Sequence, residues 1–225
     1  RHIGEPLGQL AAHAIGTAVQ PQISALAAQG DFAALQVLYR TSTAWVMFAT
    51  WPLYLTFIVQ APWLMRMFGP EYASGAPILQ VLSATMLVAT ACGAVDAVLL
   101  MAGKSTLTMI NAWAALTVNI GLNIWLIPQL GILGAALAWV AAILTTNVVP
   151  LFQVRITLDV HPFGRITFLA LVVPLLLFGA APWVVSLCGG GLLGALISFV
   201  VASAIYAPLL WRWRGPLGMT GLFRG

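Results

Sequence analysis

The stretch STLTMINAWAALTVNIGLNIWLIPQLGILGAALAWVAAILTTNVVPLFQV, residues 105–154, holds 50 residues without one charged side chain. A helix needs roughly 20 apolar residues, at about 1.5 Å each, to cross a hydrocarbon core about 30 Å thick. The stretch is therefore too long for one membrane helix and long enough for two. The segment IPQLG, residues 127–131, divides it, because proline and glycine are typical of tight turns. We predict two membrane helices, over about 105–127 and 132–154.

The whole chain shares this apolar character. Its 225 residues, of 23.9 kDa, include nine Lys or Arg and five Asp or Glu, whereas an average soluble chain of this length carries roughly 56 charged residues. Hydrophobic residues make up 61% of the sequence, and the mean hydropathy is +1.00. A water-soluble globule of this size has too little interior to bury so many apolar side chains. The composition excludes a soluble enzyme, a nucleic-acid-binding protein and a disordered chain, and it predicts an all-α integral membrane protein.

Other uncharged stretches predict the remaining membrane helices. They cover about residues 6–29, 41–65, 73–100, 166–187 and 191–211. The first of them is less apolar, and Gln9, His13, Thr17 and Gln20 form a polar stripe along it. An amphipathic helix lying on the membrane surface would normally carry Lys or Arg on its polar face, and this one has none. We therefore favour a seventh membrane helix whose polar stripe faces other helices or a wet cavity, giving a polytopic bundle of six or seven spans.

The charged residues between the spans predict an orientation. One side of the membrane receives Arg40, Lys104, Arg155, Arg165, Arg212, Arg214 and Arg224, and the other receives Arg66 alone. Cytoplasmic loops carry the excess of Lys and Arg in membrane proteins. We therefore expect the C-terminus to be cytoplasmic. The heavy use of Arg, Ala and Gly is typical of a GC-rich bacterial genome, and we predict a location in a bacterial inner membrane.

Polar residues within the predicted spans are the candidates for function. One face of the 105–127 helix carries Thr108, Asn111, Asn119 and Asn123. These side chains could line a hydrated path for a sugar, because amides and hydroxyls donate and accept hydrogen bonds without a fixed charge. The alternative is that they bond to neighbouring helices, which is common in membrane bundles.

Two titratable groups also lie at or near membrane depth. Asp96 is a possible proton or cation site. Because Lys104 follows eight residues later, Asp96 can instead lie close to the interface and have only an ion-pairing role. His13 could bind a ligand or titrate near neutrality, or simply bond to a neighbouring helix.

The sequence contains no constellation that predicts catalysis. Cys92 and Cys188 stand apart within apolar stretches, so neither a CxxC pair nor a zinc site is indicated. Paired carboxylates, a nucleophile with its base and a glycine-rich phosphate loop are also missing. We predict no catalytic residue, no metal and no cofactor. A membrane-embedded glycosyltransferase or polymerase stays a less favoured alternative, because such enzymes carry charged residues in large loops.

Several passages resemble one family of membrane proteins. The segment PQISAL (residues 21–26), with Gly30-Asp31 and LYR (38–40) after it, resembles the P-x-[IL]-S-x-L … G-D … R passage of Wzx-type polysaccharide flippases. FGPEYASGA (68–76) resembles their F-G-x-x-Y-x-x-A turn. NIGLN, LIP and GILGAA, in order within residues 119–136, resemble N-x-x-L-N-x-x-L-I-P-x-x-G-x-x-G-A-A. The resemblance covers about residues 4–155.

The resemblance implies the C-terminal half of a flippase in the multidrug/oligosaccharidyl-lipid/polysaccharide exporter superfamily. Residues 1–155 would form the C-terminal lobe, and residues 156–225 would add two membrane helices and a short tail. An N-terminal lobe upstream would complete a central cavity, which fits a chain that begins without Met. The implied function is to move a lipid-linked oligosaccharide across the bilayer by alternating access. Lipid II flippases and drug/cation antiporters of the same superfamily are the alternatives.

Overall fold

The computed structural model describes residues 20–187 and 191–213, which form helices joined by short turns and contain no strand. Within these described residues, five helices are long and apolar enough to cross a membrane, and a sixth apolar helix is shorter. The predicted all-α polytopic membrane bundle is thus confirmed. The polar stripe predicted over residues 6–29 lies mostly outside the described residues, of which 20–29 are helical.

The central element is α2 (Phe32–Phe68), a helix of 37 residues that is about 55 Å long. Gly30, with φ 69°, ends the preceding helix, and the carboxylate of Asp31 accepts a hydrogen bond from the Ala34 N–H at 3.0 Å. This cap satisfies one of the unpaired donors at the helix start. The helix therefore begins earlier than the predicted 41–65, because the cap and not the last charged residue decides where it starts.

The membrane span predicted over residues 73–100 is present as Pro70–Met101. The prediction that it is one continuous helix was wrong, because a break divides it. A 3₁₀ turn (Pro70–Gly75) leads into α3 (Ala76–Cys92), and α4 (Val95–Met101) follows after two residues. Gly93 has φ 66° and ψ −152°, outside the helical region. The chain remains apolar across the break, which is why the hydrophobic pattern concealed it.

A tight hairpin joins α5 (Ser105–Leu130) to α6 (Ile132–Leu158). The prediction that Pro128 belongs to the turn was wrong, because the helix continues through it and ends at Gly131, with φ 56°. Proline has a helical φ, so in the last turn it costs one hydrogen bond and no change of direction. A Cβ at Gly134 would collide with the backbone carbonyl of Leu126, so the two helices approach closely there.

The C-terminal helices pack on α2. The first consists of α7 (Arg165–Pro174), a π-helical turn (Leu175–Ala180) and α8 (Ala181–Leu187), and the last is α9 (Gly191–Trp213). They match the predicted spans 166–187 and 191–211 within two residues. The π turn follows Pro174 directly, and wide turns of this kind commonly accompany a disturbed helical ladder.

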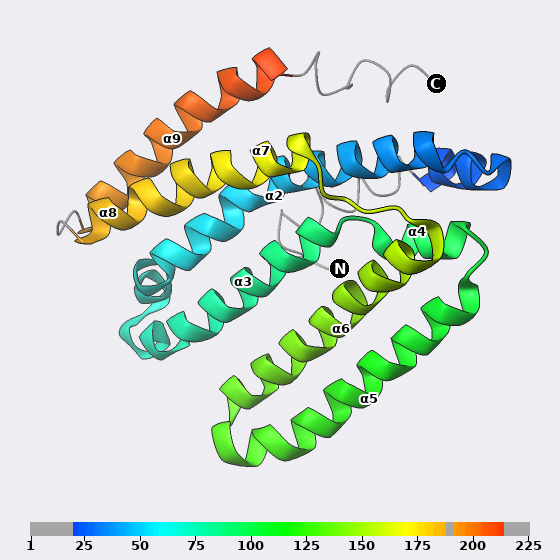
Figure 1. The fold of residues 1–225 in the computed structure, drawn as a ribbon. Helices are drawn as coiled ribbons and strands as arrows, with labels where there is room; N and C mark the ends of the chain where they lie inside the picture. Colours follow the sequence, from blue (N-terminus) through cyan, green and yellow to red (C-terminus); the bar gives the residue numbers. More distant parts are fainter. Residues whose placement is uncertain (1–19, 188–190, 214–225) are drawn as a thin grey trace.

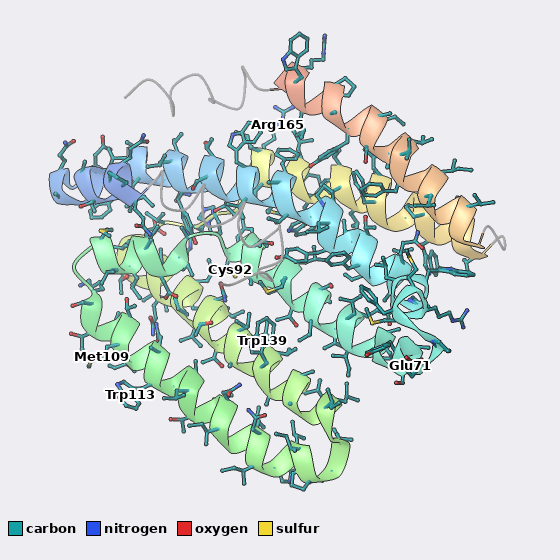
Figure 2. All side chains as sticks on the ribbon, turned by 180° about the vertical axis from the view of Figure 1, so that it is seen from behind. Glu71, Cys92, Met109, Trp113, Trp139 and Arg165 are labelled. Atoms are coloured by element: carbon teal, nitrogen blue, oxygen red, sulfur yellow. The ribbon has the colours of Figure 1, made fainter. Side chains whose placement is uncertain are left out.

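The helices lie in the spatial order α5, α6, α3, α2, α7–α8 and α9 (Figure 1). One apolar cluster joins α2, α4 and the end of α6 around Tyr39, Val98 and Val154, and a second joins α2, α7 and α9 around Phe48 and Phe178. The outer face of α5 is apolar and open, and Figure 2 shows Met109 and Trp113 pointing away from the bundle. Such a face suits contact with lipid.

Candidate functional site

The candidate site is the break at Gly93-Ala94, which lies within the span Pro70–Met101. Non-helical backbone at membrane depth is tolerated where protein buries it or where it lines a cavity. Two of the freed groups are bonded here. The Tyr39 hydroxyl donates to the Cys92 carbonyl at 2.5 Å, and the Gly93 N–H donates to the Thr90 carbonyl at 3.1 Å.

Close approach to α2 explains why a glycine stands at the break. A Cβ built on Gly93 would collide with the Thr43 side chain, whose Cβ would lie 3.0 Å away. Thr43 is fully buried, and its Oγ1 has no hydrogen-bond partner. Gly93 thus meets two separate requirements, a positive φ and space for the neighbouring helix.

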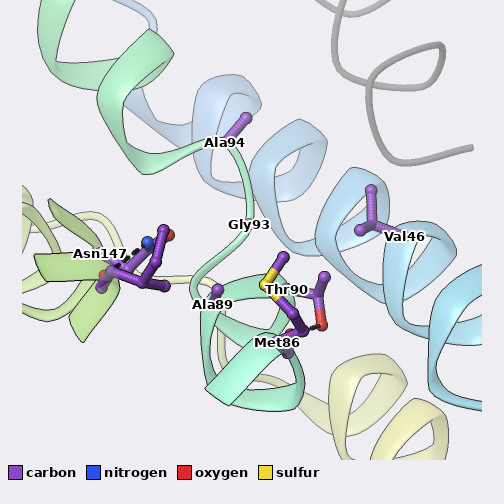
Figure 3. A pocket seen from close by; sticks show the side chains of 8 residues that line it. Val46, Met86, Ala89, Thr90, Gly93, Ala94 and Asn147 are labelled. Carbon is purple, nitrogen blue, oxygen red and sulfur yellow. Dashed lines mark hydrogen bonds between the residues drawn. The ribbon is translucent and has the colours of Figure 1, made fainter. Parts of the chain in front are cut away.

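A cavity of about 250 Å³ lies beside the break, between α2, α3 and α6 (Figure 3). Eight residues from these helices and the break line it: Val46, Met86, Ala89, Thr90, Gly93, Ala94, Ile143 and Asn147. None of them is charged, and only Thr90 and Asn147 have polar side chains.

Hydrogen bonds hold both polar side chains of the cavity in place. Thr90 Oγ1 donates to the Met86 carbonyl at 2.7 Å and accepts from Trp51 Nε1 at 3.1 Å. Asn147 Nδ2 donates to the Ile143 carbonyl at 2.8 Å. Within the described part of the chain, no donor bonds to Asn147 Oδ1. The lining can therefore hydrogen-bond a neutral polar group, and it offers no group for acid–base chemistry or for neutralising a charge.

The polar residues predicted on α5 do not line this cavity. Asn111 is 3% exposed and forms a reciprocal amide pair with Gln153 of α6, with Nδ2 to Oε1 at 2.7 Å and Nε2 to Oδ1 at 2.9 Å. Thr108 Oγ1 is buried without a hydrogen-bond partner. Asn123 Nδ2 bonds to the carbonyl and side chain of Asn119, at 2.9 and 3.1 Å.

These contacts separate the two interpretations of the α5 amides. Asn111 makes the interhelical bond that was our alternative to a sugar path. Asn119 and Asn123 are half-buried and bond along their own helix, so their role in a sugar path stays a prediction.

The other predicted residues do not line the break cavity. Asp96 is exposed in the first turn of α4. Gln20 is exposed at the start of the described helix, and Gln9, His13 and Thr17 lie outside the described residues.

Sequence reasoning missed the residues that do build the site, which are Tyr39, Thr43, Thr90 and Asn147. A signal for the first two exists in their spacing. Tyr39 and Thr43 are four residues apart and so share one face of α2, in the same turns as the motif residue Arg40. Asn147 stands in the polar run Thr145-Thr146-Asn147 near the middle of α6.

Comparison with known proteins found no relative, since no family model, no curated protein and no solved structure matches this chain. Among the described residues, no group of three or more His, Cys, Asp or Glu side chains comes together to hold a metal ion.

Proposed function

We propose that the chain is one lobe of a membrane transporter that moves a lipid-linked oligosaccharide from the cytoplasmic to the outer leaflet by alternating access. The observation that carries this proposal is the broken span at Gly93-Ala94 beside an uncharged cavity. Discontinuous helices that line a substrate site are a recurring feature of secondary transporters. A helix with a break can also bend there while its two halves stay packed, which is one way for a lobe to move during alternating access.

The lining of the cavity supports a neutral, hydroxyl-rich substrate. Thr90 and Asn147 offer a hydroxyl and an amide, whereas a cationic drug would favour a carboxylate and a pyrophosphate would favour arginine. The volume of about 250 Å³ is below the range of about 300–1,000 Å³ that is usual for ligand pockets. We therefore assign this lobe a sugar contact and assign the rest of the path to a second lobe.

The same proposal includes a place and an orientation in the cell. Arg40 and Arg155 both lie near His161, at the opposite end of α2 from Arg66. With the positive-inside rule, this end faces the cytoplasm of a bacterial cell.

The test is a flipping assay in proteoliposomes with the full-length protein that contains this chain. A fluorescent lipid-linked oligosaccharide is added, and a membrane-impermeant reductant bleaches the label in the outer leaflet. We expect Asn147→Leu to slow flipping at least about tenfold, equivalent to ~1.4 kcal/mol of barrier. Gln129→Leu is the matched control, because Gln129 is an exposed amide at the end of α5, and we expect it to leave the rate unchanged.

Other results would contradict the proposal. Equal flipping rates in the Asn147 and Gln129 variants would show that the cavity is not part of the transport path. Gradient-driven dye efflux without sugar flipping would point to a drug/cation antiporter, and transport of lipid II alone would indicate a peptidoglycan flippase. A new glycosidic product from a sugar nucleotide would indicate a transferase or polymerase.

A further inference from the structure

The loop between α6 and α7, residues 159–164, is fastened to the first turns of α2. The Gln36 side chain bonds to both backbone groups of His161. Its Oε1 accepts from the His161 N–H at 3.1 Å, and its Nε2 donates to the His161 carbonyl. One turn further along α2, Arg40 Nη2 donates to His161 Nε2 at 2.8 Å. Two side chains of one helix thus hold a single residue of the loop.

Packing on both sides of His161 keeps the loop in this position. Val160 is 1% exposed and belongs to the apolar cluster around Tyr39. The Thr167 hydroxyl donates to the Pro162 carbonyl at 2.6 Å. A Cβ on Gly164 would lie 3.1 Å from Arg40 Cδ, so the backbone of the loop follows the arginine side chain closely.

The bond between Arg40 and His161 forms only with a neutral imidazole. A guanidinium has donors and no acceptor, so His161 Nε2 must present its lone pair. Protonation of Nε2 would replace this hydrogen bond by two cations in contact.

The other charged groups near His161 do not offset this repulsion. Arg155 of α6 and Asp159 of the loop both act on the imidazole, and they pair with each other at 3.1 Å. From α7, the first residue, Arg165, adds a further exposed cation. Partial burial, and then the charges of Arg40 and Arg155, lower the pKa of His161, whereas the Phe163 backbone and Asp159 act in the opposite direction.

We propose that Gln36, Arg40 and His161 form a proton-operated latch, which holds the α6–α7 loop on α2 while His161 is neutral and releases it when His161 is protonated. In the held state the pKa of His161 lies below the ordinary histidine value of about 6.5, which applies to the released loop. The full stabilisation of the held state is therefore present above about pH 6.5, and it is lost as the pH falls through the lowered pKa. The latch is therefore closed at pH 8, and it is released progressively as the pH falls below about 6.5. Its release would free the connection between α6 and the C-terminal helices.

The test measures the distance between the loop and α2 by double electron–electron resonance. Spin labels are placed at V37C and F163C, two positions that are 64% and 51% exposed, in a C92A/C188S background of the whole chain in nanodiscs. We expect one short, narrow distance at pH 8 and a second, longer population that grows towards pH 5. The midpoint should lie below about pH 6.5.

Variants of the latch residues identify the titrating group. H161Q keeps a neutral acceptor for Arg40 and should hold the short distance at both pH values. Q36L removes both bonds to the loop backbone and should show the longer population already at pH 8. Replacing the other two histidines, His2 and His13, with glutamine should leave the titration unchanged.

A distance that is the same at pH 8 and pH 5 would overturn the proposal. A transition that persists unchanged in H161Q would also overturn it, since another group would then be titrating. Circular dichroism on the same samples separates latch release from unfolding, and loss of helix together with the distance change would count against a latch.

Discussion

The substitution Gly93→Ala tests whether the break in the span Pro70–Met101 is built as described. The new methyl group would meet two penalties at once. Gly93 has φ 66° and ψ −152°, a region that is almost limited to glycine and costs other residues about 1–3 kcal/mol. The methyl would also collide with the side chain of Thr43 on α2, and overpacking of this kind costs about 1–3 kcal/mol. Together these terms predict a loss of about 2–6 kcal/mol in the free energy of unfolding.

Two other glycines separate the penalties. Gly103 also has a positive φ, of 76°, but nothing lies within 4 Å of its Cβ position. Gly103→Ala should therefore cost only the backbone term, about 1–3 kcal/mol. Gly121 lies in the middle of α5 with open space around it, so Gly121→Ala should be neutral or stabilising by up to about 1 kcal/mol.

The collision can also be relieved from the other side. Thr43→Ala removes the hydroxyl and methyl that the new Cβ would meet, and it leaves the Thr43 Cβ 3.0 Å away. In a double-mutant cycle, Gly93→Ala should cost about 1–2 kcal/mol less in the Thr43→Ala background than in the native chain, within the ~0.5–3 kcal/mol found for contacting residues. The single change Thr43→Ala should be mild, because the lost hydroxyl has no partner.

The assay is equilibrium unfolding in mixed micelles with increasing mole fraction of sodium dodecyl sulfate, followed by far-ultraviolet circular dichroism. The reasoning is refuted if Gly93→Ala and Gly103→Ala lose the same stability, since the close approach of α2 would then add nothing. It is also refuted if the cycle with Thr43 is additive.

Three further predictions use the same unfolding assay or thiol labelling. Tyr39→Phe leaves the Cys92 carbonyl without its donor, so it should lower the free energy of unfolding by about 1–3 kcal/mol. It should also speed maleimide labelling of Cys92, which is 3% exposed in the native chain, and an unchanged labelling rate would contradict this prediction. Asn111→Leu and Gln153→Leu should each lower the free energy of unfolding by about 1–3 kcal/mol, because each leaves the other amide without its hydrogen-bond partner. The loss in the double variant should be smaller than the sum of the two single losses by about 0.6–1.7 kcal/mol. Additive losses would mean that the pair does not form. Gly134→Ala should destabilise the hairpin by about 1–3 kcal/mol, because its Cβ would meet the α5 backbone, and a neutral result would exclude the close contact.

The spans were predictable because membrane helices depend on length and lack of charge, two properties of the sequence itself. The stretch from residue 105 to 154 contains both helices of the α5–α6 hairpin, and Gly131 ends the first of them. The errors at helix ends have local causes. Asp31 caps α2 ten residues before the predicted start, and Pro128 is accommodated in the last turn of α5, where it disturbs a single bond.

The candidate site was not predictable in the same way, since it depends on contacts between segments far apart in the sequence. The break at Gly93 is stable because Tyr39 donates its hydroxyl proton to the carbonyl of Cys92, a residue 53 positions further along the chain. Polar residues in an apolar helix show that a partner is needed, but they do not show which one. Asn111 illustrates this, because its partner Gln153 lies on the next helix at a depth that only the hairpin geometry defines.

The first turns of α2 link the latch to the break. Gln36 and Arg40 hold the α6–α7 loop, while Tyr39 and Thr43 contact the break. All four residues lie within about two turns of one helix, whose backbone is rigid over such a length. A shift or rotation of α2 that separates Arg40 from His161 must therefore also move the Tyr39 hydroxyl relative to the Cys92 carbonyl. If release of the loop moves α2, the two changes are consequences of one helix movement, and a fall in pH should then raise the labelling rate of Cys92 relative to that of a free thiol at the same pH. An unchanged relative rate would mean that the loop moves while α2 stays in place.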